Sequence, residues 1–229
     1  MDRSSFVIVS DRPWNKIMLE HLRDRTGWLC ESILEPTKLT VEHLTTIDPR
    51  YLFFPHWSHR IEPEIFTRFE CVIFHMTDLP FGRGGSPLQN LIARGIYETK
   101  ITALRCVEAL DAGPVYLKRP LSLHGAAEEI FLRASAIMED MIVDIVNIHP
   151  TPIPQQETPT VFKRRTPAQG NLEKAKTLKE AFDLIRMLDA EGYPHAWLEA
   201  GPFRLEFTRA ARKTDCLLAD VRITLSKSE

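Results

Sequence analysis

CVIFH, residues 71–75, places four apolar residues directly before a histidine. Two other short apolar runs precede it in the chain, FVIV at 6–9 and YLFF at 51–54. Such runs are too short for helices and rich in strand formers, and helical spacing of apolar residues separates them. Short apolar strands that alternate with helices indicate a parallel sheet covered on both faces. We therefore predict an open α/β domain, in which ligands bind at the carboxyl ends of the strands.

The rest of the chain divides at a proline-rich segment. Expected helices cover residues 14–29, 62–69, 87–94 and 125–147, and residues 100–123 are expected to form two strands with a turn at 111–114. Because Pro150, Pro152, Pro154 and Pro159 fall close together, we read 149–159 as a linker. We expect a Rossmann-like catalytic domain at 1–148, able to fold alone. The linker and a small C-terminal α+β subdomain (a helix at 178–188 and strands at 196–198, 204–207 and 217–225) make up 149–229.

Composition narrows the class of protein. The net charge of −2 offers no general field for a polyanion, so nucleic-acid binding is not expected. The four cysteines lie far apart, which favours reduced thiols: Cys30, Cys71, Cys106 and Cys216. The opening MDRSSFVIVSDRPW has too short an apolar run for a signal peptide, and no stretch approaches the roughly 20 apolar residues of a membrane span. We expect a cytoplasmic protein without a membrane partner.

Two residues carry the predicted chemistry. His75 ends a buried strand, where an imidazole can exchange protons with a ligand, although a histidine there can also simply cap the strand. Asp111 begins an Asp-x-Gly-Pro turn, in which an aspartate ordinarily bonds its own backbone. The pair is more informative than either residue alone. Acyl transfer to an amine needs a proton acceptor and a carboxylate that orients or charges it.

The motifs around this pair resemble those of the folate-dependent formyltransferases. His75-x-Thr77-x-Leu79-Pro80 with Arg83-Gly84-x-x-Pro87 resembles the family's His-x-Ser-x-Leu-Pro…Arg-Gly-x-x-Pro block, and LDAGP at 110–114 resembles its Leu-Asp-Thr-Gly-Pro block. RIEP at 60–63 is similar to the segment beside the pterin, and FKRRTP at 162–167 to the start of the C-terminal part. Within the family, the block FFPHWS at 53–58 with FHMTDLPFGRGGSPLQNLI at 74–92, and the segment IRMLDAEGYP at 185–194, look most like sugar N-formyltransferases of pseudaminic acid biosynthesis.

The resemblance implies a role for each matching residue. It implies catalysis by His75 and Asp111, with 10-formyltetrahydrofolate as co-substrate and no metal. The folate would be wrapped by Arg60, Ile61, Cys106 and Val107. The acceptor side of the pocket would be bordered by Met76, Thr77, Arg83 and Gly84.

One position departs from the family pattern. The family has an asparagine two residues before the histidine, which bonds the developing oxyanion, and this chain has Ile73 there. Losing one such donor costs on the order of 3 kcal/mol in enzymes that depend on it. We expect His56, which follows the 51–54 strand, to take over the role. Asn90 and the Thr77 hydroxyl are lesser candidates, and a structural role for His56 stays open.

Other readings of these segments are weaker. His56-x-x-His59 with His75 could hold zinc, but no carboxylate partner is evident and the chemistry needs no metal. Gly82-x-Gly84-Gly85 lacks the spacing and the Gly-Lys-Ser/Thr ending of phosphate loops. The basic run at 163–165 is typical of a solvated surface.

The expected reaction moves the formyl group of 10-formyltetrahydrofolate onto the amine of a 4-amino-4,6-dideoxy sugar nucleotide in a pseudaminic acid or surface-glycan pathway. The expected partner is this small-molecule sugar nucleotide, with no nucleic acid and no membrane; a homodimer is left open. The alternative acceptor is methionyl-tRNA, against which the short tail with few basic positions argues. A catalytically impaired folate-binding relative is the alternative that Ile73 keeps open.

Overall fold

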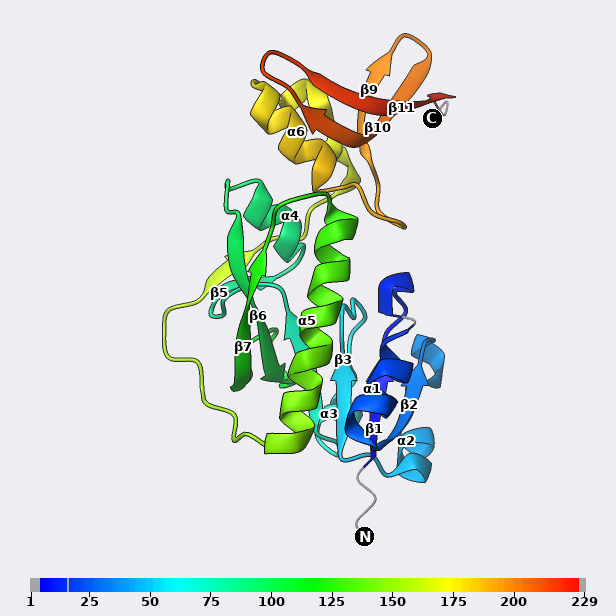
Figure 1. Ribbon diagram of the computed structural model, residues 1–229, viewed down its shortest axis with the longest axis vertical. Coiled ribbons are helices and arrows are strands. Elements are labelled where there is room, and N and C mark those ends of the chain that lie inside the picture. The colour runs from blue at the N-terminus through cyan, green and yellow to red at the C-terminus, as the bar shows by residue number, and fades with distance from the viewer. Residues whose placement is uncertain (1–4, 16, 227–229) are drawn as a thin grey trace. The chain divides into compact units, whose positions relative to one another are not determined.

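The central element of the computed structural model is a mostly parallel sheet (Figure 1). The structure describes residues 5–15 and 17–226, so the first four residues of the opening stretch lie outside it. Within that part, the sheet has the strand order β2-β1-β3-β4-β6-β7. Its strands are β1 (Ser5–Val9), β2 (Leu29–Ile33), β3 (Tyr51–Phe54), β4 (Cys71–His75), β6 (Glu98–Arg105) and β7 (Val115–Ser122). Strands β2, β1, β3 and β4 are parallel, and β6 runs antiparallel to β4.

Helices and short strands connect and cover this sheet. The α-helices are α1 (Met18–Thr26), α2 (Val41–Ile47), α3 (Pro63–Phe66), α4 (Pro87–Ile92), α5 (Ala127–Ile148) and α6 (Leu178–Arg186). Short 3-10 helices lie at η1 (Pro13–Asn15), η2 (Pro36–Lys38), η3 (Pro167–Gly170) and η4 (Leu172–Lys174). Strand β5 (Phe81–Gly84) pairs with β8 (Thr160–Phe162), and β9 (Ala196–Ala200), β10 (Phe203–Arg212) and β11 (Leu217–Leu225) form an antiparallel sheet.

Alternation along the strands separates the two faces of the central sheet. On one face, Val7, Leu52 and Cys71 pack with Leu44 of α2 and Ile65 of α3. On the other face, the rings of Phe6, Phe53 and Phe74 are in contact, and Figure 1 shows α5 (green) running along the sheet. His75 has the parity of Cys71 and Ile73, so it belongs to the α2–α3 face at the carboxyl end of β4.

The chain forms two compact units built from interleaved segments. The first contains Met1–Gly84, Thr99–Leu121 and Leu132–Val161. The second contains Gly85–Glu98, Ser122–Phe131 and Phe162–Glu229. The domain boundary that we predicted at 148/149 stays a prediction. The compact unit that holds the C-terminal residues also includes two earlier segments, Gly85–Glu98 and Ser122–Phe131.

A buried arginine of α6 bonds a separate segment of the second unit. Arg186 of α6 is 3% exposed and its Nε donates to Asp183 at 2.7 Å. Its Nη1 donates to the carbonyl oxygens of Leu123 (2.6 Å) and Gly125 (3.0 Å). Removing one member of a buried pair costs about 3–5 kcal/mol, because the other charge is left without compensation. The two bonds from Nη1 join α6 to the segment that precedes α5, and Asp183 compensates the buried charge.

The predicted α/β class with a parallel sheet and a small C-terminal α+β part is confirmed. Two helices are clearly shorter than expected. The 14–29 pattern yields α1, which ends where Gly27 adopts φ +67 as a left-handed cap, and β2 follows; the 62–69 pattern yields only α3. Lys16, inside the expected helix, lies outside the described residues. The glycine-rich stretch after His75 contains a strand that no sequence pattern indicated, β5, because Phe81–Gly84 pairs with β8.

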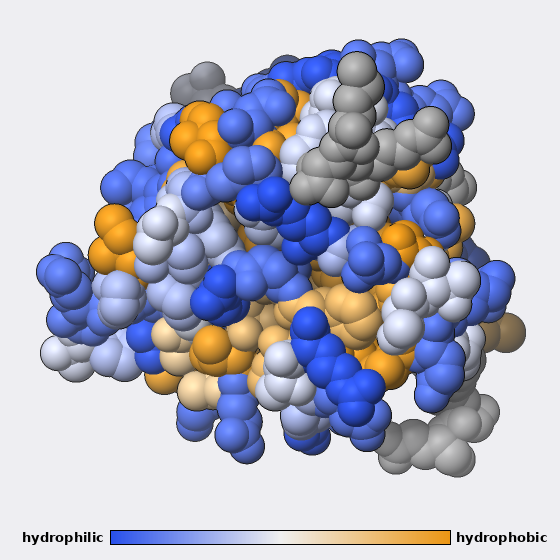
Figure 2. All heavy atoms as spheres, turned by 90° about the horizontal axis from the view of Figure 1, so that it is seen from below, coloured by the Kyte–Doolittle hydropathy of each residue, from blue (hydrophilic) through white to orange (hydrophobic). Residues whose placement is uncertain are grey.

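No helix in the part of the chain that the structure describes is long and apolar enough to cross a membrane. On the face drawn in Figure 2, hydrophobic residues are interspersed with hydrophilic ones. Isolated exposed apolar side chains of this kind are ordinary on protein surfaces.

Candidate active site

His75 and Asp111 lie together, as the sequence predicts. His75 is the last residue of β4, and Asp111 lies in the turn between β6 and β7. Nδ1 of His75 is 3.6 Å from Oδ2 of Asp111, and both side chains are less than a tenth exposed. The distance exceeds that of a hydrogen bond, so the two atoms face each other without a direct bond. The fold thus gathers a proton acceptor and a carboxylate at the sheet edge where ligands bind in such domains.

The hydrogen bond on the other ring nitrogen fixes the tautomer of His75. Nε2 lies 2.8 Å from the carbonyl oxygen of Gly82. Because a carbonyl oxygen can only accept, Nε2 carries a hydrogen and Nδ1 is the atom that gains or loses a proton. That atom is the one that faces Asp111.

The backbone around Asp111 is tightly constrained. Asp111 has φ +51, a left-handed conformation that is uncommon for a residue with a side chain. Its Oδ2 accepts from the backbone N–H of Gly84 at 2.8 Å. A Cβ at Gly113 would lie 1.8 Å from the carbonyl oxygen of Arg105, so this position requires glycine. The Asp-x-Gly-Pro pattern thus encodes both a close backbone approach and a fixed carboxylate.

His56 is bonded on its Nδ1 side. This nitrogen accepts from the indole Nε1 of Trp14 at 2.9 Å and lies 3.5 Å from Nδ2 of Asn15. An indole N–H can only donate, so Nδ1 is unprotonated and Nε2 carries the hydrogen. Burial, with a smaller contribution from the charge of Arg12, lowers the pKa of His56 to about 3. The imidazole is therefore a neutral donor through Nε2 at physiological pH.

The place of His56 in the sheet fits the role that we predicted for it. Phe54 of β3 pairs with Ile73 of β4 in parallel register, and His56 and His75 follow these residues by two positions. Both histidines therefore leave neighbouring strands at the same edge. The assignment of His56 to the oxyanion stays a prediction.

Replacing His56 by alanine tests this assignment. We expect the turnover number to fall about tenfold or more while the folate dissociation constant changes little, because such a bond tightens in the transition state. Since the pKa of about 3 keeps the ring neutral, the ratio of wild-type to variant turnover should stay constant from pH 5 to 8. His59→Ala, which removes an exposed histidine beside Asp11, is the control. Equal losses of folate binding and turnover would indicate that His56 only lines the binding pocket.

The lesser candidates for this bond are already engaged. Nδ2 of Asn90 donates to the carbonyl oxygens of Gly85 and Lys163, both at 2.9 Å, which uses its two hydrogens. The Thr77 hydroxyl donates to Gly82 and is fully buried. Ile73, at the position of the family's asparagine, is partly buried and packs against the core cluster beneath it.

The residues predicted to hold the folate differ in exposure. Ile61 and Cys106 are buried in one core cluster on the α2–α3 face. Burial, with a smaller effect of the Asp111 charge, raises the pKa of the Cys106 thiol to about 11. Val107 is 36% exposed, and the Arg60 side chain is 77% exposed beside Glu62. Arg60 and Ile61 follow β3, whose carboxyl end lies at the same sheet edge as His75, whereas Cys106 follows the antiparallel β6 and its N–H donates to the carbonyl oxygen of Cys71, at the start of β4. The role of all four residues in folate binding stays a prediction.

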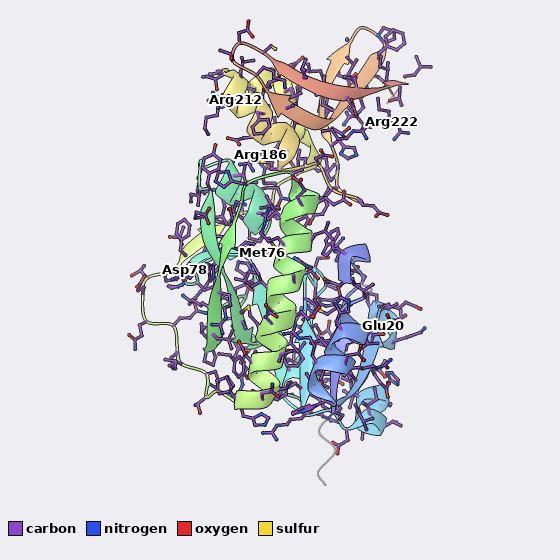
Figure 3. All side chains as sticks on the ribbon, in the orientation of Figure 1. Glu20, Met76, Asp78, Arg186, Arg212 and Arg222 are labelled. Carbon is purple, nitrogen blue, oxygen red and sulfur yellow. The ribbon has the colours of Figure 1, made fainter. Side chains whose placement is uncertain are left out.

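The residues predicted to border the acceptor also divide into two kinds. Met76 and Thr77 are buried, whereas the neighbouring Asp78 is partly exposed; Figure 3 labels Met76 and Asp78. Asp78 forms an ion pair with Lys100 at 2.9 Å. Arg83 and Gly84 lie on β5 and are partly exposed. Direct contact with an acceptor is therefore more readily made by the β5 residues, and all four assignments stay predictions.

The zinc reading finds no support in the geometry. Across residues 5–15 and 17–226, no three His, Cys, Asp or Glu side chains gather closely enough to hold a metal ion. His56 accepts from Trp14, and His59 contacts Asp11 at 3.2 Å.

Gln155 also contacts the site, although no sequence pattern singles it out. It lies in the proline-rich segment, yet it bonds both Arg83 and the turn that holds Asp111. Composition made this segment a linker, and no motif marks the position.

Comparison with known proteins identifies the family. A family model described as the C-terminal domain of methionyl-tRNA formyltransferase matches residues 167–224. A solved structure, methionyl-tRNA formyltransferase from Clostridium thermocellum, is 45% identical, covers 97% of this chain and 100% of its own, and has a TM-score of 0.95. The chain belongs to the formyltransferase family.

Curated members of the family align over part of their length. The methionyl-tRNA formyltransferase of Lactobacillus johnsonii is 24% identical over 80% of this chain and 62% of its own. Other curated relatives align over about 40% of theirs, so the chain spans about half the length of the curated relatives that it matches.

The predicted sugar-nucleotide acceptor is wrong. A sugar N-formyltransferase from Shewanella sp. FDAARGOS_354 is 15% identical with a TM-score of 0.70, a likeness of fold, whereas the Clostridium protein is 45% identical over the whole chain. The segments that suggested a sugar enzyme include structural elements of the fold: Phe53 and Phe54 in β3, the end of β4 with β5 and α4, and the buried end of α6. Core residues report the fold rather than the acceptor.

The prediction of a sugar-nucleotide partner and of no nucleic acid is wrong for the same reason, since the whole-length relative is named for methionyl-tRNA. The net charge of −2 is an average that hides an uneven distribution. Residues 162–229 carry 13 Lys and Arg against 10 Asp and Glu, so the segment judged poor in basic positions is net positive. A local excess can matter to a polyanion when the total does not.

Proposed function

We propose that this chain transfers the formyl group of 10-formyltetrahydrofolate to the α-amine of methionyl-tRNA in the cytoplasm. The observation that supports methionyl-tRNA as the acceptor is the 45% identity, over 97% of this chain, to a protein named methionyl-tRNA formyltransferase. The buried His75–Asp111 pair supports the chemistry. The free thiols of Cys30, Cys71, Cys106 and Cys216 support a reducing compartment.

The geometry supports a division of labour in the proposed reaction. The amine attacks the formyl carbon, and the tetrahedral intermediate must lose a proton from nitrogen before the folate nitrogen departs. Nδ1 of His75 takes that proton, because Nε2 is held by Gly82, and returns it to the folate nitrogen, which leaves as an amine when its bond to the formyl carbon breaks. Asp111, whose Oδ2 accepts from the Gly84 N–H, faces Nδ1 and stabilises the imidazolium that results. The Nε2–H of His56 is the proposed donor to the oxyanion.

A second candidate is a folate-binding relative with impaired turnover, which Ile73 favours because an isoleucine cannot donate a hydrogen bond. Two measurements separate the candidates. Calorimetry with tetrahydrofolate reports binding, and release of tetrahydrofolate from 10-formyltetrahydrofolate reports turnover. We expect binding together with release that requires methionyl-tRNA and fails with uncharged tRNA. Binding without release would support the impaired relative.

A further inference from the structure

Gln155 uses both ends of its side-chain amide. Its Oε1 accepts from Arg83 Nε at 3.1 Å and from Arg83 Nη2 at 2.7 Å. Its Nε2 donates to the carbonyl oxygens of Asp111 at 2.9 Å and of Gly113 at 2.8 Å. These four bonds use both hydrogens and both lone pairs of the amide. The side chain therefore holds two parts of the site together.

The proline-rich segment is anchored on both sides of Gln155. Ile153 and Val115 exchange backbone hydrogen bonds of 2.8 Å in each direction, which attaches the segment to the start of β7. Thr160 N donates to the carbonyl oxygen of Pro80 at 3.2 Å, and β8 then pairs with β5. Gln155 thus lies on a strap fastened to the strand after the Asp111 turn and to the strand after the His75 loop.

Both groups that Gln155 bonds control the catalytic carboxylate. The Asp111 backbone has φ +51, a conformation that surrounding contacts must maintain. Gly84, whose N–H fixes Oδ2 of Asp111, is the residue after Arg83. An amide that bonds both the Asp111 carbonyl and the Arg83 guanidinium therefore constrains the two groups of the Gly84 N–H to Asp111 Oδ2 hydrogen bond, its donor through Arg83 and its acceptor through the Asp111 backbone.

We propose that Gln155 is a positioning residue, which clamps the Asp111 turn to β5 so that the carboxylate stays opposite Nδ1 of His75. This inference rests on the proposed formyl transfer for its kinetic consequence, but the clamp itself is a structural claim that can be tested without activity.

Two substitutions separate the two ends of the amide. Gln155→Ala removes all four bonds. Gln155→Glu keeps an acceptor for Arg83 but has no hydrogen for the carbonyl oxygens of Asp111 and Gly113. Gln156→Ala alters the exposed neighbour in the same segment and is the matched control. Each protein is assayed for turnover with methionyl-tRNA, for tetrahydrofolate binding by calorimetry, and for hydrogen exchange at the Gly84 amide by NMR.

We expect both Gln155 variants to lose about tenfold or more in turnover, since small misplacements of reacting groups can cost up to about 10²-fold. Tetrahydrofolate affinity should change by less than about twofold, and the Gly84 amide should exchange about tenfold faster or more. Gln156→Ala should match the wild type in all three measurements.

Wild-type turnover and unchanged Gly84 exchange in Gln155→Ala would overturn the proposal. If that variant does not fold, Gln155→Glu decides, and wild-type turnover with unchanged exchange in it would also overturn the clamp. If the wild-type protein formylates no methionyl-tRNA, the proposed function fails. Faster Gly84 exchange in the variants would then still establish the clamp.

Discussion

His75→Asn is expected to leave the fold intact and to lower the turnover number by at least about 10²-fold, the usual range for loss of a general base. Asparagine keeps a polar side chain at this position, but its amide is shorter than the imidazole and does not reach the carbonyl oxygen of Gly82 as Nε2 does. It has no group that can take a proton in place of Nδ1. The measurement is the rate of tetrahydrofolate release at saturating methionyl-tRNA.

One control variant and one variant of the partner residue accompany this measurement. His43→Asn makes the same change at an exposed histidine of α2 and should behave as wild type. Asp111→Asn keeps an oxygen for the Gly84 N–H but removes the charge that stabilises the imidazolium, so its turnover should also fall. Near-normal turnover in a well-folded His75→Asn protein would remove His75 from the chemistry.

A chain truncated after residue 155 is expected not to melt cooperatively. The proline-rich composition suggests the opposite, a core that folds alone, but the second unit contains Gly85–Glu98 and Ser122–Phe131. Within that unit, Nε2 of Gln89 donates to the carbonyl oxygen of Met187, and Arg186 bonds Leu123 and Gly125. Truncation removes these partners and Phe162, which is 2% exposed. Buried polar groups left without partners cost about 1–3 kcal/mol each, a large part of a typical stability of 5–15 kcal/mol.

Circular dichroism during heating checks this expectation, with the full chain as reference. The full chain should show a sharp transition, whereas residues 1–155 should show a broad one and should bind a dye that reports exposed apolar surface. One sharp transition in the truncated chain would contradict this expectation and support the proline-rich segment as a linker between independently folding domains.

Much of the fold was predictable because its core strands are continuous apolar runs. The runs at 6–9, 51–54 and 71–74 became β1, β3 and β4, and the pattern at 125–147 became α5. Strand β2 gave no such signal. It lies at an edge of the sheet, where Glu31 and Ser32 can face solvent, so its sequence does not form an apolar run.

The candidate site was predictable where a motif fixes the backbone. Asp111 and Gly113 lie in a turn whose geometry demands those residues, and His75 ends a buried strand. Gln155 was not predictable, because its role depends on a long-range approach of a proline-rich segment to the Asp111 turn. The acceptor could not be predicted from the sequence motifs either, because the segments used to assign it, at 53–58, 74–92 and 185–194, include elements of the fold and of the His75 site and do not identify an acceptor.

The most direct test of the central claim is mass spectrometry of methionyl-tRNA after incubation with the protein and 10-formyltetrahydrofolate. The account predicts that the methionyl group gains one formyl group on its α-amine, and that His75→Asn gives at most about 1% of that product in the same time. Methionyl-tRNA that stays unmodified, with wild-type protein that binds tetrahydrofolate, would contradict the account.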